Sequence, residues 1–341
     1  MCGTSLDGLD LAYCSFRQTE GKWRYKCVHT DEIELPNELR TKLQNATNSN
    51  AHELALLDIE VGHFFGKETN DFIEKNKIKP DFISSHGVTI FHQPDQHITL
   101  QIGSGAVIAS ETNITTICDF RSQDVAKGGQ GAPLVPYPDQ LLFSDFGATL
   151  NLGGFANLTI IQKEPLTGFD VCVCNKALND LTQLHNGSPF DANGDHSRKG
   201  SINQRLLDEL NDLAFYKCLP PKSLGHEWYM EHMIPLLAKP IATKDKLRTM
   251  VEHIAQQIGN ILPESGTTLV TGGGAHHKYL IERIEKNTSG NITIPDRQIV
   301  DFKEAIDFAF LGALRLQNLT NIKASVTGAN SDSVAGCIYQ P

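Results

Sequence analysis

The chain has 341 residues, of which 40% are apolar and 28 are glycine, and its formal net charge is −10. Because a single hydrophobic core seldom serves so long a chain, we expect two domains, and the acidic balance argues against a nucleic-acid partner. No apolar run reaches the roughly 18 residues of a membrane span and the start lacks the pattern of a signal peptide, so we expect a soluble, cytoplasmic protein with no membrane partner.

The first ten residues carry groups suited to holding a phosphate and its metal ion: Gly3, Thr4, Ser5, Asp7, Gly8 and Asp10. The glycines free the backbone to turn tightly and to present N–H groups to an anion. The hydroxyls add donors, and the carboxylates are oxygen ligands for a metal ion. A polar turn between two strands would have the same composition, so both interpretations stand at this point.

Strand-like and helix-like segments alternate after this motif, which favours an α/β fold. The first series consists of a hairpin at 9–16 and 23–30, helical spacing over 38–75, strands at 81–86, 99–103 and 115–120, and a helix from about 104. The second series consists of strands at 147–152, 156–162 and 267–270 and helices at 175–185, 202–211, 243–261 and 303–317. The strand, glycine turn and strand at 147–162 echo the amino-terminal unit, which suggests two related domains with a cleft between them.

Three glycines, Gly272, Gly273 and Gly274, follow one predicted strand and precede a helix-like segment. Glycines at such a point let a phosphate or nucleotide approach the N–H groups of a helix start. A tight strand-to-helix turn is the alternative, but it requires one glycine, so nucleotide contact is favoured. No G-x-x-x-x-G-K-[ST] string occurs, which excludes a P-loop enzyme.

A glycine- and proline-rich string at 128–136 follows Arg121 and Asp124. An arginine beside such an irregular loop is suited to a partly anionic substrate, because its guanidinium binds a carboxylate through two hydrogen bonds. A structural hinge with solvated charges is equally compatible. Of the eight cysteines, Cys172 and Cys174 form a C-x-C pair without a partner pair at zinc-ligand spacing, so we expect reduced thiols and no zinc site.

Taken together, these motifs resemble the anhydro-N-acetylmuramic acid kinase family, which belongs to the superfamily of sugar kinases, actin and heat-shock-type ATPases. The matching strings lie at 3–8, 85–87, 100–103, 119–121, 128–136, 151–154, 156–158, 168–170, 220–223, 272–275, 304–305 and 325–329. The resemblance implies an α/β fold with two actin-like (ribonuclease-H-like) domains around a nucleotide-binding cleft. We expect the first domain to comprise residues 1–121 and 322–341, and the second to comprise residues 122–321.

The resemblance also implies a reaction that uses ATP and Mg²⁺. Water opens the 1,6-anhydro ring of anhydro-N-acetylmuramic acid while the 6-oxygen takes the γ-phosphoryl group, in the recycling of peptidoglycan sugars by a homodimer. Asp170 is the implied general base, and Asp7 the implied metal ligand. The implied phosphate and nucleotide contacts are Gly3, Thr4, Ser5, Asp7, Gly8, Gly153, Gly154, Gly272, Gly273 and Gly274. The implied sugar contacts are Arg121, Asp124, Asn175 and Glu304.

The chain departs from the family pattern after Asp170, where Thr-Gly-Pro-x-Asn is usual and Val171-Cys-Val-Cys-Asn175 stands here. His277 and Val88 stand where asparagine and glutamine are common. These departures keep two alternatives open: a divergent member that binds ATP in a regulatory or chaperone-like role without sugar turnover, and a kinase of another sugar. Family members usually carry a first strand before the position of Met1, so we expect that the given start is late.

Overall fold

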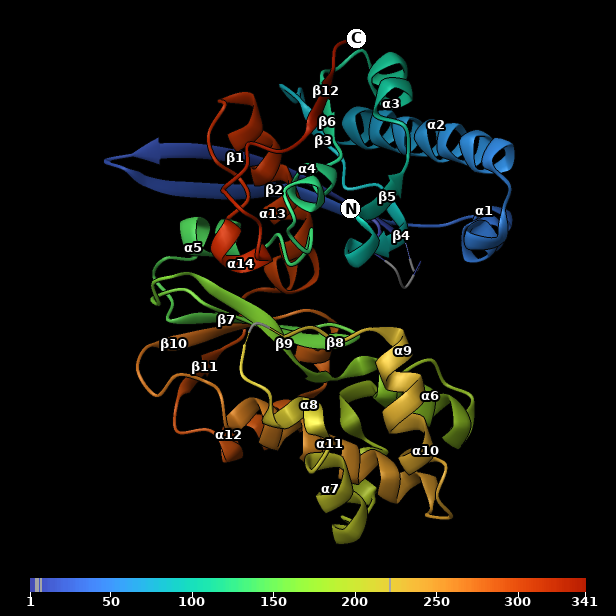
Figure 1. Ribbon diagram of the computed structural model, residues 1–341, viewed down its shortest axis with the longest axis vertical. Coiled ribbons are helices and arrows are strands. Elements are labelled where there is room, and N and C mark those ends of the chain that lie inside the picture. The colour runs from blue at the N-terminus through green and yellow to red at the C-terminus, as the bar shows by residue number, and fades with distance from the viewer. Residues whose placement is uncertain (4–5, 7, 221) are drawn as a thin grey trace. The chain divides into compact units, whose positions relative to one another are not determined.

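The structure, a computed structural model, describes residues 1–3, 6, 8–220 and 222–341. The chain divides into two compact units (Figure 1): a first unit of Met1–Leu142 with Phe302–Pro341, and a second unit of Phe143–Asp301. Residues 122–142 and 302–321, which we expected in the second domain, therefore belong to the first unit. The reason is packing, since Leu134, Phe308 and Leu311 share a buried cluster with Ile117 and Phe120. No described helix is long and apolar enough to cross a membrane.

The second unit is built on one five-stranded sheet. Its strands are β7 (Ala148–Leu152), β8 (Phe155–Ile160), β9 (Thr167–Val173), β10 (Thr267–Thr271) and β11 (Asn291–Thr293). They lie in the order β11-β10-β7-β8-β9, in which β7, β8 and β9 pair antiparallel and β10 and β11 continue parallel to β7. Three antiparallel strands followed by two parallel ones form the sheet of a ribonuclease-H-like domain. The α/β, actin-like fold expected from the sequence is therefore confirmed in this unit.

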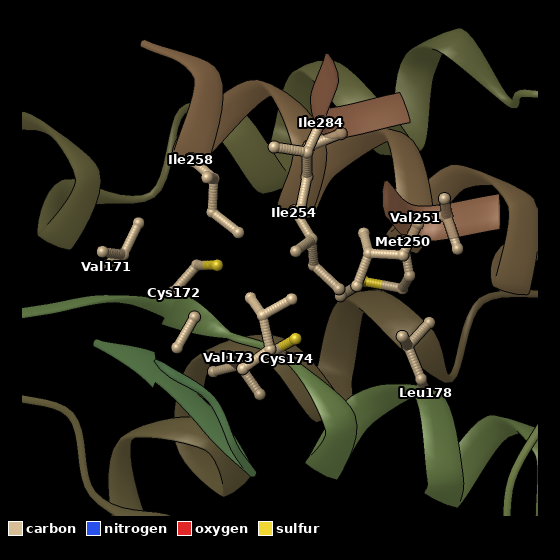
Figure 2. Close-up of a cluster of buried hydrophobic side chains, with 14 of the residues drawn as sticks. Val171, Cys172, Val173, Cys174, Leu178, Met250, Val251, Ile254, Ile258 and Ile284 are labelled. Atoms are coloured by element: carbon tan, nitrogen blue, oxygen red, sulfur yellow. The ribbon is translucent and has the colours of Figure 1, made fainter. Parts of the chain in front are cut away.

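The helices of the second unit are α6 (Asn175–Asn186), α7 (Gln204–Asn211), α8 (Ala214–Lys217), α9 (His226–Trp228), α10 (Ile234–Leu237), α11 (Thr243–Gly259) and α12 (Lys278–Asn287). Of these, α11 packs against β9, and α6, α7 and α12 pack against α11. Figure 2 shows how the end of β9 faces α11, with Val171 and Cys172 near Ile254 and Ile258. Burial of each such aliphatic side chain stabilises the fold by about 1.5–3 kcal/mol, which explains why α11 remains a helix although Ala242 provides no side-chain cap.

Among the described residues, each sheet of the first unit has fewer strands than the sheet of the second unit. Its strands are β1 (Gly8–Thr19), β2 (Lys22–Glu34), β3 (Ile83–Ser84), β4 (Val88–Gln93), β5 (Ile98–Ile102), β6 (Thr116–Cys118) and β12 (Cys337–Tyr339). β1 and β2 form the expected hairpin, and Gly21 supplies the left-handed φ of +79° that its turn requires. β3 runs parallel to β6, β12 runs antiparallel to β6, and β4 and β5 form a second antiparallel pair.

The helices of the first unit are α1 (Asn37–Asn45), α2 (Ala51–Asn76), α3 (Gly105–Thr112), α4 (Ser122–Ala126), α5 (Pro136–Leu142), α13 (Arg297–Leu316), which begins in the second unit, and α14 (Ala324–Thr327). The helical stretch expected at 38–75 is thus two helices. The division arises at Asn50, whose side chain accepts bonds from the N–H groups of His52 and Glu53 while Glu53 returns a bond to the Asn50 N–H. This capping box starts a new helix at that point.

A buried lysine joins α5 to α13. Lys303 Nζ lies 2.9 Å from Asp307 Oδ2 and also contacts Asp139, and all three side chains are buried. Burial acts to lower the pKa of Lys303, but the attraction of the two carboxylates outweighs this effect and raises the pKa above its usual value. The lysine therefore stays protonated and compensates the negative charge inside the first unit.

Candidate functional site

Two glycine turns of the second unit lie side by side. Gly153 and Gly154 follow β7, and Gly272 to Gly274 follow β10, the parallel neighbour of β7. The carboxyl ends of parallel strands meet at one edge of a sheet, so turns that are far apart in the sequence become adjacent here. A Cβ atom added to Gly274 would lie 2.6 Å from Leu152 Cβ.

Asn175 joins these two turns at the start of α6. Its backbone N–H donates to the Gly153 carbonyl at 3.1 Å, and its side-chain Nδ2 donates to the Leu152 carbonyl at 2.8 Å. Its amide also lies over the other turn, 3.7 Å from where a Cβ of Gly273 would be. The structure therefore groups Asn175, which we expected to contact the sugar, with the glycines expected to contact the nucleotide.

Packing explains some of these glycines and not others. At Gly272, φ is +81°, and a Cβ atom would lie 2.3 Å from Asn151 Oδ1. At Gly153, Gly154 and Gly273, the nearest described atom would be 3.4 Å or farther from an added Cβ, and φ is not in the left-handed region. Neither packing among the described residues nor backbone strain requires glycine at these three positions. An uncovered backbone of this kind leaves room for a ligand to approach closely.

Asp170 lies on β9, three residues before the end of the strand. Its Oδ2 accepts a hydrogen bond from the Leu224 N–H at 2.8 Å, and its own N–H donates to the Lys222 carbonyl at 3.0 Å. In the part of the chain that the structure describes, Oδ1 has no hydrogen-bond partner. Burial raises the pKa of Asp170 to about 6, although the Leu224 N–H acts in the opposite direction. A carboxylate with one oxygen held, one available and a pKa near neutrality has the properties of a general base.

The segment that holds Asp170 was not assigned a role from the sequence. Lys222 and Leu224 provide its two hydrogen bonds, and the string at 220–223 was recognised only as a family motif. Pro221, which belongs to this string, lies outside the described residues. The string at 220–223 was itself the sequence signal that this loop has a role. Rules that use only neighbouring residues cannot predict that the loop contacts a strand some 50 residues earlier in the sequence.

The unusual residues after Asp170 form the end of a strand. Val171 to Cys174 are all buried (Figure 2). β9 continues to Val173, which pairs with Phe155. The backbone N–H groups of Cys174 and Lys176 donate to the Gly154 carbonyl at 2.9 and 3.2 Å. These amide groups therefore support the glycine turn and do not point to a ligand.

In the first unit, Arg121 is joined to a histidine. Its Nε and Nη2 lie 3.1 and 2.9 Å from His86 Nε2, and its Nη1 donates to the Gly131 carbonyl at 2.7 Å. Because a guanidinium can only donate, His86 Nε2 must accept, which leaves the proton on Nδ1 for the Gly87 carbonyl at 3.0 Å. Burial, followed by the charge of Arg121, lowers the pKa of His86 well below its usual value, so this ring is neutral.

Arg121 itself remains charged at neutral pH. Burial lowers its pKa to about 10, and the charge of Glu304 opposes that shift. Glu304 is exposed on α13, so its carboxylate is accessible to a ligand. The expected sugar contacts of Arg121 and Glu304 stay predictions. His86, in the string at 85–87, is a neighbour of Arg121 to which we assigned no role from the sequence.

Asp124 is enclosed by its own unit. It is fully buried, its Oδ1 accepts a bond from Thr327 Oγ1 at 2.7 Å, and its Oδ2 accepts one from the Gly131 N–H at 2.8 Å. These bonds tie α4 to the loop at 128–136 and to α14. We therefore propose that Asp124 positions this loop instead of contacting the sugar directly.

The amino-terminal motif is described only in part. Thr4, Ser5 and Asp7 lie outside the described residues. Gly8 begins β1, and a Cβ atom there would lie 2.9 Å from the Ile33 carbonyl oxygen, so packing requires a glycine at this position. Among the residues that the structure describes, no group of three or more His, Cys, Asp or Glu side chains is arranged to hold a metal ion. Asp7 as a metal ligand stays a prediction.

Comparison with known proteins decides the family. The sequence pattern of the family "Anhydro-N-acetylmuramic acid kinase" matches residues 1–341. The protein of that name from Sulfurimonas denitrificans is 32% identical over 366 residues, covering 100% of this chain and 98% of that protein. The one from Mannheimia succiniciproducens is 33% identical over 372 residues, covering 99% and 97%. The chain belongs to the anhydro-N-acetylmuramic acid kinase family.

The resemblance inferred from the motifs is thereby confirmed over the full chain. A solved structure, the activator of the 2-hydroxyisocaproyl-CoA dehydratase from Clostridium difficile with bound ADPNP, is similar at a TM-score of 0.36 and 12% identity, covering 65% of this chain and 87% of that one. A likeness at this level carries no argument about the site. Membership in the anhydro-N-acetylmuramic acid kinase family rests on the sequence relatives.

Proposed function

We propose that this chain is an ATP-dependent kinase that opens 1,6-anhydro-N-acetylmuramic acid with water and yields N-acetylmuramic acid 6-phosphate, in the recycling of cell-wall sugars. Full-length membership in the family supports the reaction. The observation that carries the proposal is Asp170, with one carboxylate oxygen held by Leu224, the other without a described partner, and burial raising its pKa to about 6.

In this reaction the water oxygen forms a bond to C1 of the sugar as the C1–O6 bond of the anhydro bridge breaks. Asp170 takes one proton of the water, and the other stays on the new C1 hydroxyl. The released O6 forms a bond to the γ-phosphorus of ATP, whose bond to the bridging β–γ oxygen breaks, and ADP leaves. The base must be deprotonated to act, which a pKa of about 6 permits at neutral pH.

For the nucleotide, the open glycines Gly153, Gly154 and Gly273 support close approach of the phosphates. Mg²⁺ is generally held by one or two carboxylates together with substrate phosphates, so a single carboxylate such as Asp7 is a sufficient protein ligand. Bound with ATP, it would supply neutralisation of phosphate charge. Arg121 and Glu304 are our proposed sugar contacts. That the kinase is a cytoplasmic homodimer is likewise a proposal, based on the family alone.

The proposal is tested by measuring ADP release from ATP with different acceptors. We expect stimulation by 1,6-anhydro-N-acetylmuramic acid and formation of a 6-phosphate product. Preference for a hexose with a free 6-hydroxyl would instead make the chain a kinase of another sugar.

A second candidate function is ATP binding without sugar turnover. It is favoured by the stretch from Val171 to Cys174, where the neighbouring amides of Cys174 and Lys176 serve the protein's own turn. Tight ATP binding, measured by calorimetry, together with no acceptor-dependent ADP release would support this candidate over the kinase.

Glycines that packing requires and glycines that it does not require should respond differently to alanine substitution, the first in stability and the second in ATP binding. Gly273→Ala should unfold at nearly the same temperature as the parent but raise the KM for ATP about tenfold, a loss of about 1.4 kcal/mol, because only a ligand requires the open space there. Gly272→Ala should lower the free energy of unfolding by about 1–3 kcal/mol, because its Cβ meets Asn151 and its φ is left-handed. Thermal unfolding and ATP titration distinguish them. An unchanged KM in Gly273→Ala would contradict the assignment of this turn to the nucleotide.

A further inference from the structure

Two cysteines face each other across the hairpin of β1 and β2 (Figure 1). Cys14 of β1 and Cys27 of β2 are direct register partners, and in the structure both carry thiols. The two-residue turn at 20–21 sets this register, because the ladder continues from Thr19 and Lys22 to the cysteines without a shift. The hairpin itself therefore aligns the two thiols.

The position of this pair in the ladder also brings its backbones close together. Thr19 and Lys22 close the turn, and the closing pair of a two-residue hairpin exchanges two hydrogen bonds. Hydrogen-bonded and non-hydrogen-bonded pairs then alternate, so the cysteines, five pairs farther on, form a non-hydrogen-bonded pair. The Cα atoms of such a pair are typically about 4.5 Å apart, within the range of about 4.4–6.8 Å that a disulfide spans.

The two thiols are directed at each other. A hydrogen bond joins the side chains of Cys14 and Cys27, and it is the largest of the effects that raise the pKa of Cys14. Cys118 of β6 and Cys337 of β12 are also register partners, but the Cys337 thiol donates to Asp119 Oδ2 at 3.9 Å. The hydrogen of that thiol is therefore directed at a carboxylate and not at the opposite cysteine.

The cysteines of the hairpin lie on the face that packs against α13. Phe16, two residues after Cys14 on the same face of β1, has its ring centroid 5.1 Å from that of Phe310. The ring of Trp23 on β2 lies 5.0 Å from the same phenylalanine. Asp307, one turn before Phe310 on α13, is close enough for its charge to raise the pKa of Cys14 as well. Both strands are thus anchored to one helix, which preserves the alignment of the thiols.

We propose that Cys14 and Cys27 form a redox-active dithiol, which low-molecular-weight disulfides such as oxidised glutathione convert to a cross-strand disulfide. Both side chains are half-buried, so they are partly accessible to a small reagent.

The conversion takes two exchange steps. One thiol loses its proton and attacks a sulfur of the reagent, whose S–S bond breaks, and the thiolate that leaves takes up the proton. The other thiol then attacks the protein sulfur of this mixed disulfide and loses its own proton. The bond between protein and reagent breaks, and the second reagent thiolate leaves with that proton. The two cysteines are oxidised to one disulfide, and the reagent is reduced to two thiols.

The test measures how readily this disulfide forms in the folded and in the unfolded full chain. The chain is equilibrated in glutathione buffers of different oxidation states, with and without enough urea to unfold it, then quenched with acid and alkylated. Trypsin cuts between the cysteines, for example after Arg17 and Lys22, so linked peptides report the disulfide in mass spectrometry. We expect the equilibrium constant to be about tenfold or more higher in the folded chain, because a disulfide of ordinary geometry favours the folded state by such a factor. A constant that is equal or lower in the folded chain would overturn the proposal.

Substitutions and the intact mass verify that the bond is the one within the hairpin. Cys14→Ser and Cys27→Ser should each abolish the linked peptides. Cys218→Ser, which removes an exposed thiol of the second unit, is the matched control and should leave the constant unchanged. The linked species should have the mass of one chain, and a linkage found only between two chains, or lost in Cys218→Ser, contradicts the proposal. The assay contains neither ATP nor sugar, so its result is independent of the proposed kinase function.

Discussion

Asp170→Asn is expected to lower the turnover of ATP and 1,6-anhydro-N-acetylmuramic acid by about 100- to 10,000-fold while the protein stays folded. Loss of a general base costs rates of this order. The asparagine side chain keeps an oxygen that accepts the Leu224 N–H bond but cannot take a proton from water. ADP release under saturating substrates measures the effect. The exposed Asp208 of α7 provides a matched control, and Asp208→Asn should leave the rate unchanged.

The same substitution should stabilise the protein at alkaline pH. Burial raises the pKa of Asp170 from an unfolded value of about 3.9 to about 6, so the folded state binds the proton more tightly than the unfolded state. Stability from this group is therefore present below pH 4 and lost as pH rises through 6. Asp170→Asn removes the cost of the buried charge, and we expect a gain of about 1–3 kcal/mol at pH 8 and none at pH 4.

The pH profile of the parent enzyme gives an independent check of this assignment. Because the base acts in its deprotonated form, kcat/KM should fall below a pH of about 6. Retained sugar-dependent ADP release in Asp170→Asn, with the acidic limb unchanged, would show that another group activates the water.

Lys303→Met is expected to have the largest effect on stability, a loss of about 3–5 kcal/mol in the free energy of unfolding. The substitution leaves the buried carboxylates of Asp139 and Asp307 without the cation that compensates them. Urea unfolding monitored by circular dichroism measures the loss. Lys67→Met is the matched control, because Lys67 is 65% exposed and its ion pairs should contribute less than about 1 kcal/mol.

A triple variant separates charge from packing at this site. Replacing Lys303 with Met and both Asp139 and Asp307 with Leu removes all three charges together. Such replacements of buried ion pairs are often neutral or stabilising, so the triple variant should recover much of the stability lost in Lys303→Met. If Lys303→Met alone lowers the free energy of unfolding by less than about 1 kcal/mol, the two carboxylates accept protons at no cost in stability.

Features with local causes were predictable from the sequence. The hairpin of β1 and β2, the strand-to-helix step at Ser104 and the glycine turns after β7 and β10 each follow from turn residues beside an apolar run. The family was also recognisable from the sequence. Each glycine or proline in its irregular strings determines the backbone geometry at its own position, so the strings are specific to the family. The strand expected at 81–86 is shorter, since only Ile83 and Ser84 pair with β6 in register.

The domain boundaries depended on tertiary structure. Nothing local marks residues 122–142 or 302–321 as belonging with the first unit. Their membership follows from the burial of Leu134, Phe308 and Leu311 against Ile117 and Phe120. The ion pair of Lys303 with Asp139 also joins the two segments to each other. The contacts of Phe308, Leu311 and Lys303 join parts of the chain more than 160 residues apart, which periodicity within one segment cannot reveal.

The sequence by itself determined the family, the α/β class and the residue types of the site. Only the tertiary structure decided the surroundings and the protonation of these residues. The surroundings are the enclosure of Asp124 and the open backbone at Gly273, and the protonation properties are the raised pKa of Asp170 and the neutral ring of His86. The physical reason is that backbone conformation depends on neighbouring residues in the chain, whereas desolvation and electrostatic interaction depend on which distant segments surround a group.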